Sequence, residues 1–172
     1  MTQALLSFGS NQGDRFEHLR QAVEELSDAV LVVSGIYETK PWGDPDQPDY
    51  LNAVALVADA VPARAWLERA RELEERAGRV RDPNRRFGPR TLDVDVIAVW
   101  SDDGEAQLSD DPEYTLPHPR AHERAFVLRP WLDIAPYAEL PGHGPVQDLL
   151  RTEPVAADLS GLHARPDLEL VR

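Results

Sequence analysis

The sequence contains no cysteine and only one lysine, Lys40, among its 172 residues. Without cysteine the chain can have no disulfide, no thiolate metal site and no cysteine nucleophile. No apolar run approaches the roughly 18 residues of a membrane-spanning helix, and the first residues do not show the basic and apolar regions of a secretory signal. These absences predict a cytoplasmic protein with no membrane partner. With 42% apolar residues, the chain is predicted to form a single domain, residues 1–172.

Negative charge dominates the composition, with a net charge of −13. A protein that coats nucleic acid needs a cationic surface, so this charge argues against a nucleic-acid partner. The positive charge is concentrated, because five arginines lie between residues 79 and 90. An acidic protein with one arginine-rich segment is suited to binding a small polyanion. A solvated helix end followed by a charged loop is the alternative that composition leaves open.

The apolar pattern predicts alternating strands and helices. Strands are predicted at residues 4–8, 31–39, 50–57 and 92–100, and helices at 14–28 and from Pro62 onward. The segment 40–49 between two of the strands is rich in proline and glycine, and a loop of this length is often functional. The resulting order, β-α-β-β-α-β, is that of the ferredoxin-like α+β fold.

The remainder of the chain is less regular. Residues 101–112 are acidic and are predicted to form a loop, and residues 121–132 are predicted to form a short helix. The tail, residues 151–172, shows weak periodicity, with a possible edge element at 168–171. The tail could be an addition to the domain, a dimer contact or a segment without fixed structure.

Asp93 and Asp95 are the sharpest chemical signal, because they interrupt an otherwise buried strand pattern. Aspartate is disfavoured in strand interiors, and a spacing of two places both side chains on one face. Two such carboxylates repel each other unless a cation lies between them, and Mg²⁺ prefers one or two carboxylates together with waters and phosphates. Two exposed acids on the solvated face of a sheet are the alternative.

The arginine-rich segment leads directly into this strand. Guanidinium groups make bidentate contacts to phosphate oxygens, so arginines beside a metal-binding pair of carboxylates favour polyphosphate chemistry. Tyr50 and Asn52 share one strand face and could stack on a flat heterocycle and bind its edge, although a core-edge tyrosine is the simpler interpretation. The segment from Gly9 to Asp14 is predicted to be a tight turn capped by Asn11 or Asp14, since it lacks a phosphate-loop pattern.

Several segments in a fixed order together resemble the 6-hydroxymethyl-7,8-dihydropterin pyrophosphokinase family, also called 2-amino-4-hydroxy-6-hydroxymethyldihydropteridine diphosphokinases. The segments are Ser7–Asn11, Tyr37–Gly43, Gln47–Ala53, Gly78–Arg81, Arg86–Asp95, Leu116–Arg120 and Arg124–Leu128. The stretch Gly88-Pro89-Arg90-Thr91-Leu92-Asp93-Val94-Asp95 is the most specific. The resemblance extends over about residues 4–150 and leaves the tail uncovered.

The resemblance implies a ferredoxin-like fold with a mainly antiparallel sheet, and transfer of the β,γ-diphosphate of ATP to the pterin hydroxyl, giving AMP, in tetrahydrofolate biosynthesis. ATP would be the co-substrate, and two Mg²⁺ ions would be held by Asp93 and Asp95. Arg81 and Arg90 would be catalytic together with these aspartates. A monomer is expected. By position, the pterin would contact Thr39, Trp42, Gly43, Tyr50, Asn52 and Phe126. ATP would contact Glu74, Arg81, Arg85, Arg86, Phe87, Arg90, Thr115, His118 and Arg124.

Some positions depart from the family pattern. Phe87 stands where a tryptophan is common, and Pro119 stands where an aromatic residue is often found. Two other classes of function remain open on the paired aspartates. A nucleotide-binding module would bind ATP without producing AMP, and a two-metal nucleotidyltransferase would release pyrophosphate. The pterin-facing residues, Tyr50, Asn52 and Phe126, count against both.

Overall fold

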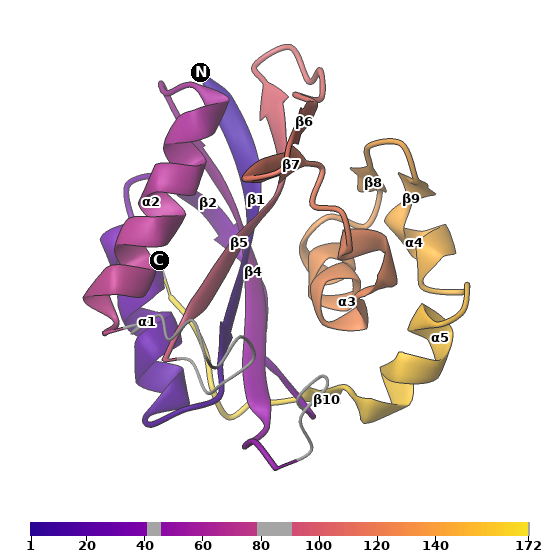
Figure 1. The fold of residues 1–172 in the computed structure, drawn as a ribbon. Coiled ribbons are helices and arrows are strands. Elements are labelled where there is room, and N and C mark those ends of the chain that lie inside the picture. The colour runs from indigo at the N-terminus through magenta and orange to yellow at the C-terminus, as the bar shows by residue number, and fades with distance from the viewer. Residues whose placement is uncertain (41–45, 79–90, 172) are drawn as a thin grey trace.

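An antiparallel sheet forms the centre of the protein. The computed structural model describes residues 1–40, 46–78 and 91–171, within which six strands form this sheet in the order β10-β3-β4-β1-β5, with β2 also pairing with β4 (Figure 1). All of these pairings are antiparallel. The strands are β1 (Thr2–Ser10), β2 (Val30–Val33), β3 (Tyr37–Thr39), β4 (Tyr50–Asp59), β5 (Asp93–Ser101) and β10 (His163–Ala164).

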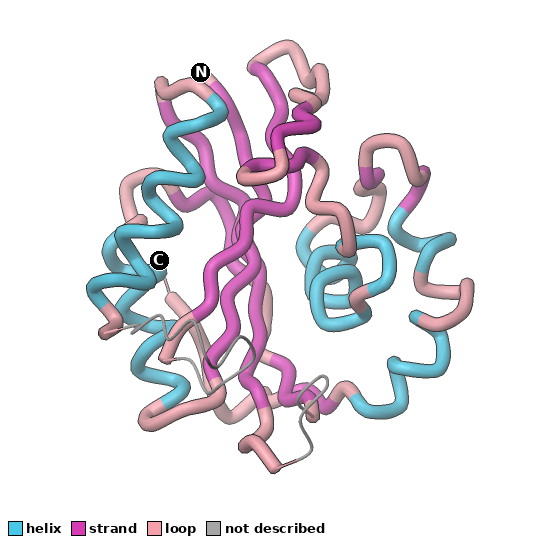
Figure 2. Tube along the Cα trace, in the orientation of Figure 1, coloured by secondary structure: helices cyan, strands magenta, loops and turns pink. Residues whose placement is uncertain are grey.

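Helices cover both faces of this sheet. Figures 1 and 2 show α1 and α2 on one face and α3, α4 and α5 on the other. The helices are α1 (Arg15–Glu25), α2 (Ala63–Arg76), α3 (Ala125–Ile134), α4 (Val146–Leu149) and α5 (Val155–Asp158). None of the described helices is long and apolar enough to cross a membrane. The predicted α+β class with a mainly antiparallel sheet is confirmed. The β-α-β-β-α-β order holds except that the second predicted strand is divided into β2 and β3.

Alternation along β1 divides the core into two clusters. Successive strand side chains point to opposite faces, so Ala4, Leu6 and Phe8 pack in the cluster that includes α1 and α2. Leu5 points the other way and packs in the cluster that includes α3. The central strand thus contributes to both layers. Its neighbour β4 alternates in register with it throughout, whereas the pairing with β5 shifts by one residue between Leu5 and Leu6.

The helices on the first face begin and pack as the sequence predicts. The Asp14 carboxylate accepts the backbone N–H of Glu17 at 3.1 Å, which caps the start of α1. In α2 the side chain of Trp66 is fully buried, and its indole N–H donates to the Thr2 hydroxyl at 2.8 Å. This bond ties α2 to the beginning of β1.

The single strand predicted at residues 31–39 is wrong, because the structure divides it into β2 and β3. Between them, the Ser34 backbone N–H donates to the Val54 carbonyl at 2.8 Å, and the Ser34 hydroxyl accepts the Val54 N–H at 2.9 Å. A serine hydroxyl that takes a backbone hydrogen bond competes with the regular ladder. The chain therefore bends here while both strands remain paired with β4.

Two further expectations need correction. The predicted acidic loop at 101–112 contains β6 (Ser109–Asp111), which pairs with β7 (Tyr114–Leu116). The predicted edge element at 168–171 is also wrong, since the tail residues that pair are those of β10. Leu170 instead inserts its side chain into the first cluster and is 6% exposed.

The helical segment predicted at 121–132 is confirmed and ends two residues later than predicted. It begins as a short 3₁₀ turn (Ala121–Glu123) and continues as α3. A second small hairpin, β8 (Glu139–Leu140) with β9 (Gly144–Pro145), follows α3.

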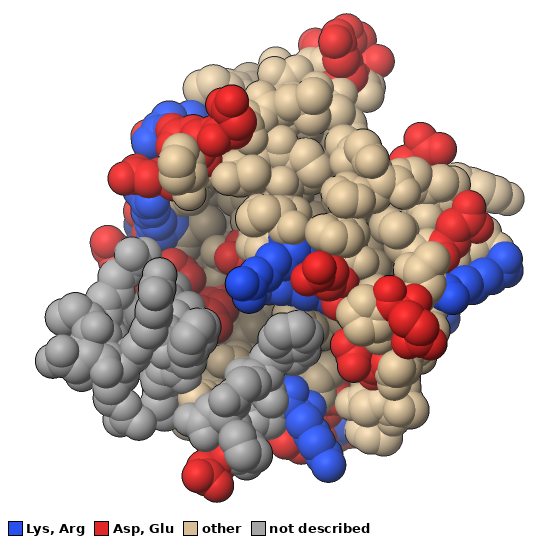
Figure 3. Space-filling view, turned by 45° about the vertical axis from the view of Figure 1, so that its right-hand side comes forward, with Lys and Arg blue, Asp and Glu red and all other residues tan. Residues whose placement is uncertain are grey.

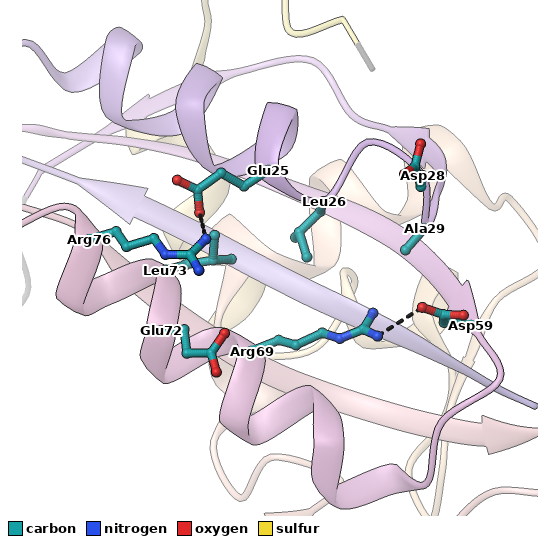
Figure 4. Close-up of a pocket in the computed structure, with 9 residues that line it drawn as sticks. All are labelled: Glu25, Leu26, Asp28, Ala29, Asp59, Arg69, Glu72, Leu73 and Arg76. Atoms are coloured by element: carbon teal, nitrogen blue, oxygen red, sulfur yellow. Dashed lines mark hydrogen bonds and ion pairs between the residues drawn. The ribbon is translucent and has the colours of Figure 1, made fainter.

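A hollow of about 270 Å³ lies between α1 and α2, on the face away from α3 (Figure 4). Arg76 pairs with Glu25 at 2.9 Å, which joins the two helices. Arg69 pairs with Asp59 at 2.8 Å and joins α2 to the end of β4. These ion pairs are partly exposed, so each contributes little stability. The apolar cluster under α1 and α2 is what holds the helices of this layer on the sheet.

The burial of Trp131 on α3 generates a stability prediction. Its side chain is 1% exposed, so Trp131→Ala is expected to lower the free energy of unfolding by about 3–5 kcal/mol through lost burial and a cavity. Urea denaturation followed by circular dichroism measures the loss. As a control, Leu108→Ala at a position 73% exposed should change it by less than about 0.5 kcal/mol. Equal effects of the two substitutions would contradict this packing.

Candidate functional site

A row of residues crosses the sheet on the face that carries α3. Asn52 of β4 lies opposite Gly9 of β1, and Gly9 lies opposite Asp93 of β5. One step along, Ser7 of β1 lies opposite Asp95. These residues alternate with side chains packed under α1 and α2, so they share the opposite face. Asp93 and Asp95 lie on this same face, as their spacing of two predicts. Both side chains are half-buried.

Gly9 allows the neighbouring side chains to approach the central strand. A Cβ atom at this position would lie 3.1 Å from the Asn52 side-chain oxygen and 3.5 Å from a ring carbon of Tyr50. Glycine inside a strand often marks such a close approach. The sequence predicts a turn from Gly9 onward, whereas β1 continues through Ser10. The glycine was therefore a signal that the sequence analysis missed.

Asn52 has a fixed orientation. Its side-chain amide donates to the Thr39 hydroxyl at 2.8 Å, and both residues are buried. Thr39 lies opposite Tyr50 in the β3–β4 pairing. Three of the residues that the resemblance assigns to the pterin are thus brought together at one end of β3 and β4.

The beginning of α3 faces the carboxylates of β5. Arg124, which precedes α3, has its guanidinium 3.3 Å from the Asp95 carboxylate. The same guanidinium lies over the Phe126 ring, 5.5 Å from its centroid. Arg124 therefore links the expected metal ligand Asp95 to Phe126, an expected pterin contact. In Figure 3 the upper part of the face shown is mostly uncharged, and acidic and basic side chains lie intermixed across its middle.

His118 follows β7 and is held near Asp95. Its backbone N–H donates to the Ile97 carbonyl at 2.7 Å, and its Nδ1 accepts the Arg120 backbone N–H at 3.2 Å. Burial lowers the pKa of His118, with the Asp95 carboxylate opposing that shift. The neutral ring that results at pH 7 carries its proton on Nε2, because Nδ1 is an acceptor. In this tautomer Nε2–H is the hydrogen-bond donor of the ring.

Glu74 of α2, which is expected to lie near the nucleoside, also binds the backbone of β5. Its side chain is 6% exposed and accepts the backbone N–H of Val94 at 3.1 Å. Val94 lies between Asp93 and Asp95, so this bond fixes α2 against the strand that carries both carboxylates. Thr115, also expected near ATP, donates its hydroxyl to the Asp111 carbonyl within the β6–β7 hairpin at 3.0 Å.

Several expected site residues lie outside the described residues. They are Trp42, Gly43, Arg81, Arg85, Arg86, Phe87 and Arg90. The segments that contain them are bordered by described residues of the site. Thr39 and Tyr50 flank one segment, and the Ser10 hydroxyl donates at 2.6 Å to the carbonyl of Thr91, which follows the other.

The turn after β1 contains residues that the sequence analysis did not assign. The Asn11 side chain is fully buried and donates to the Gln47 side-chain oxygen at 2.9 Å. Arg15 donates to the Asp49 carbonyl at 2.9 Å. Of the two predicted caps, Asn11 or Asp14, it is Asp14 that caps locally, whereas Asn11 reaches across to the segment that leads into β4. No local pattern shows a contact of this kind, because the partners are more than thirty positions apart.

Comparison with protein families gives a match over most of the chain. The family described as 7,8-dihydro-6-hydroxymethylpterin-pyrophosphokinase (HPPK) matches residues 5–136. A Mycobacterium tuberculosis protein (strain H37Rv) named 2-amino-4-hydroxy-6-hydroxymethyldihydropteridine pyrophosphokinase is 45% identical, covering 99% of this chain and 94% of the relative. The Mycobacterium leprae protein of the same name is 49% identical, covering 86% of this chain and 79% of the relative.

Solved structures with the same fold include Plasmodium falciparum HPPK-DHPS with SDX-DHP. It superposes with a TM-score of 0.62 at 12% sequence identity. The match covers 87% of this chain and 44% of that chain, so this chain spans less than half of the larger protein. At this identity the likeness establishes the fold alone.

The contact between Glu74 and Val94 generates a prediction. Glu74→Ala leaves a buried backbone N–H without this acceptor and is expected to lower the free energy of unfolding by about 1–3 kcal/mol. Glu74→Gln keeps a side-chain oxygen in the same place and should lose less.

Urea denaturation compares both variants with Glu68→Ala, at an exposed position of the same helix, which should be neutral. A glutamine variant as unstable as the alanine variant would show that the retained oxygen is not what matters.

Proposed function

The chain belongs to the 7,8-dihydro-6-hydroxymethylpterin-pyrophosphokinase family, and on this premise we propose which of its residues carry the reaction. The protein is a pyrophosphokinase that acts on hydroxymethyldihydropterin in folate biosynthesis, with ATP as co-substrate. We propose the specific reaction in which the β,γ-diphosphate of ATP passes to the 6-hydroxymethyl oxygen and AMP is released.

One observation carries the assignment of residues. Asn52, Gly9 and Asp93 are cross-strand neighbours on a single face of the sheet. This row places a residue expected to bind the pterin one strand away from a residue expected to hold Mg²⁺. A diphosphate transfer needs both substrates in contact, because phosphoryl-type transfers depend mainly on positioning and charge neutralisation.

The pterin is proposed to lie at the end of β3 and β4, between Tyr50 and Phe126. The flat faces of these rings suit a bicyclic heterocycle. Asn52 presents its side-chain oxygen toward the space above Gly9, while its amide is held by Thr39. A fixed amide oxygen is an acceptor for the N–H groups on a pterin edge. Trp42 and Gly43 complete this proposed set.

The residues of β5 fit a Mg²⁺ site. Asp93 and Asp95 supply oxygen ligands on one face, and the Asp95 side chain is 43% exposed beside Arg124. No group of three or more histidine or acidic side chains suited to a metal is found within the described ranges, but Mg²⁺ needs only one or two carboxylates together with waters and substrate phosphates. We propose that these aspartates hold two Mg²⁺ ions, which when bound supply charge neutralisation and Lewis acidity at the phosphates.

Cationic and hydrogen-bonding groups around β5 are proposed to hold the triphosphate. Arg124 sits between Asp95 and Phe126, so it can contact a phosphate oxygen beside either substrate. The neutral His118 can donate from Nε2 without adding charge. Glu74 and Thr115 are proposed to lie near the nucleoside. Further phosphate and nucleotide contacts are proposed for Arg81, Arg85, Arg86, Phe87 and Arg90.

Residues 1–172 are proposed to work as one domain and as a cytoplasmic monomer that binds neither nucleic acid nor membrane. The acidic net charge supports the absence of a nucleic-acid partner. Because β10 of the same chain covers the edge of β3, that edge is not open for strand pairing with a second copy.

The role of Asp95 is tested by measuring AMP and pterin diphosphate from ATP, Mg²⁺ and 6-hydroxymethyl-7,8-dihydropterin. Asp95→Asn removes a charged ligand and is expected to lower kcat by about 10²-fold or more. Asp110→Asn, on the exposed side of β6, is the matched control and should keep the kcat of the unaltered protein.

Three outcomes would contradict these assignments. Full activity of Asp95→Asn would show that Asp95 is not a required Mg²⁺ ligand. Product formation in the presence of a chelator would show that the reaction does not need Mg²⁺. Release of pyrophosphate in place of AMP would indicate nucleotidyl transfer.

The approach of Asn52 and Tyr50 to Gly9 generates a second prediction. Gly9→Ala places a methyl group 3.1 Å from the Asn52 oxygen and is expected to raise the KM for the pterin by about tenfold. The KM for ATP should change little. Steady-state kinetics with each substrate varied in turn measures both constants.

The control is Gly35→Ala, where an added Cβ meets nothing within 4 Å. An unchanged KM for the pterin in Gly9→Ala would place the pterin elsewhere.

A further inference from the structure

The C-terminal segment, residues 163–170, crosses the edge of the sheet. Figure 1 shows it passing from α5 on one face, past β10, to the face that carries α1 and α2. Within β10, His163 lies opposite Glu38 and Ala164 lies opposite Tyr37. The next residue, Arg165, donates its backbone N–H to the Ile36 carbonyl at 2.8 Å. The segment therefore pairs with β3 along the side that β4 does not cover.

Two arginines converge on the carboxylate of Glu38 from separate parts of the chain. Arg165 binds one oxygen at 3.2 Å, and Arg15, at the start of α1, binds the other at 2.6 Å. The Glu38 side chain is only 24% exposed. The hydrogen bond from Arg15 holds the pKa of Glu38 below its usual value, with Arg165 adding to the effect. The carboxylate therefore joins α1, β3 and the C-terminal segment.

The ion pairs of Glu38 with Arg15 and Arg165 are attached to the rest of the protein on two sides. On the C-terminal side, Leu170 is buried in the core and Leu168 is partly buried against it. On the other side, the Arg15 guanidinium also donates to the carbonyl of Asp49, directly before Tyr50. Arg165 is thus held by a packed segment, and its partner Glu38 is tied to the beginning of β4.

β3 depends on such contacts because it has only three residues. A short strand with few hydrogen bonds opens more easily than the long central strands. Its residue Thr39 accepts the Asn52 amide, and its residue Tyr37 donates its hydroxyl to Asp133 of α3. Any displacement of β3 would therefore move the side-chain amide that faces Gly9.

We propose that Arg165 and Glu38 make the C-terminal segment a positioning element for the pterin side of the site. The segment holds β3 so that Thr39 keeps Asn52 in the orientation that binds the pterin edge. Among the described residues, the hydrogen bonds and ion pairs of the segment go to β3 and the residue before it, or stay within the segment. Its only link to β5 and β7 within those residues is apolar, through the core cluster that holds Leu170. The inference rests on the proposed pterin site, and Arg165 with its segment lies beyond residue 136, where the family match ends.

The test compares Arg165→Ala, Arg165→Lys and Glu38→Gln with the unaltered protein. Loss of a partly exposed ion pair is expected to raise the KM for the pterin by about two- to fivefold. Glu38→Gln should have the larger effect, because it weakens both arginine contacts. The KM for ATP and kcat should stay unchanged. Arg165→Lys keeps the charge and should recover most of the pterin affinity.

The control is Arg151→Ala, an exposed tail arginine, which should leave all constants unchanged. Calorimetric titration of 6-hydroxymethyl-7,8-dihydropterin, with Mg²⁺ and a non-reactive ATP analogue present, gives the pterin affinity without turnover.

Three results would overturn the inference. In one, Arg165→Ala loses thermal stability but keeps its KM for the pterin. In another, the KM values for pterin and ATP rise together, as they would on general loosening. In the third, lysine fails to recover the affinity that alanine loses. These results can be told apart from failure of the proposed function itself. In that case the unaltered protein would make no AMP.

Discussion

The structure depends on the pairing of β1 with two long strands at once. β1 is hydrogen-bonded antiparallel to β4 on one side and to β5 on the other. Because strand side chains alternate, this double register decides for all three strands which residues lie under α1 and α2 and which lie on the α3 face. A shift of one residue in either pairing would separate Asn52, Gly9 and Asp93. The same backbone contacts that build the core therefore also align the site.

The α3 face of the sheet is divided between packing and chemistry. At one end, Leu5, Val54 and Ile97 form a buried cluster with α3. At the other end, the same three strands present Gly9, Asn52 and Asp93. The long strands allow this division, because each extends beyond the area that α3 covers. Arg124 and Phe126 lie at the start of α3, where the apolar part of the face meets the polar part. Rigid strands and a packed helix can hold binding groups more precisely than loops.

Contacts distant in sequence fix the ends of the short strands. Asn11 and Arg15 reach the segment before β4, and Glu38 is bound from both α1 and the C-terminal segment. Each ion pair is partly exposed and contributes modestly to stability. Their effect is on position, because β3 is too short to be held by its ladder with β4 alone. Glu74 performs a related task on the other side, where it joins α2 to the strand of the two aspartates.

The sequence by itself determined the element order, the shared face of Asp93 and Asp95, and the family, because periodicity and the motif around Asp93 are local. It did not determine the division of residues 31–39 into β2 and β3, since that depends on Ser34 bonding to Val54 of another strand. It also placed the tail's edge element at 168–171, whereas Leu170 is buried and β10 pairs instead. The role of Gly9 was equally hidden. Only tertiary structure decided these points, because a hydrogen bond or close approach between residues far apart in the chain leaves no local pattern.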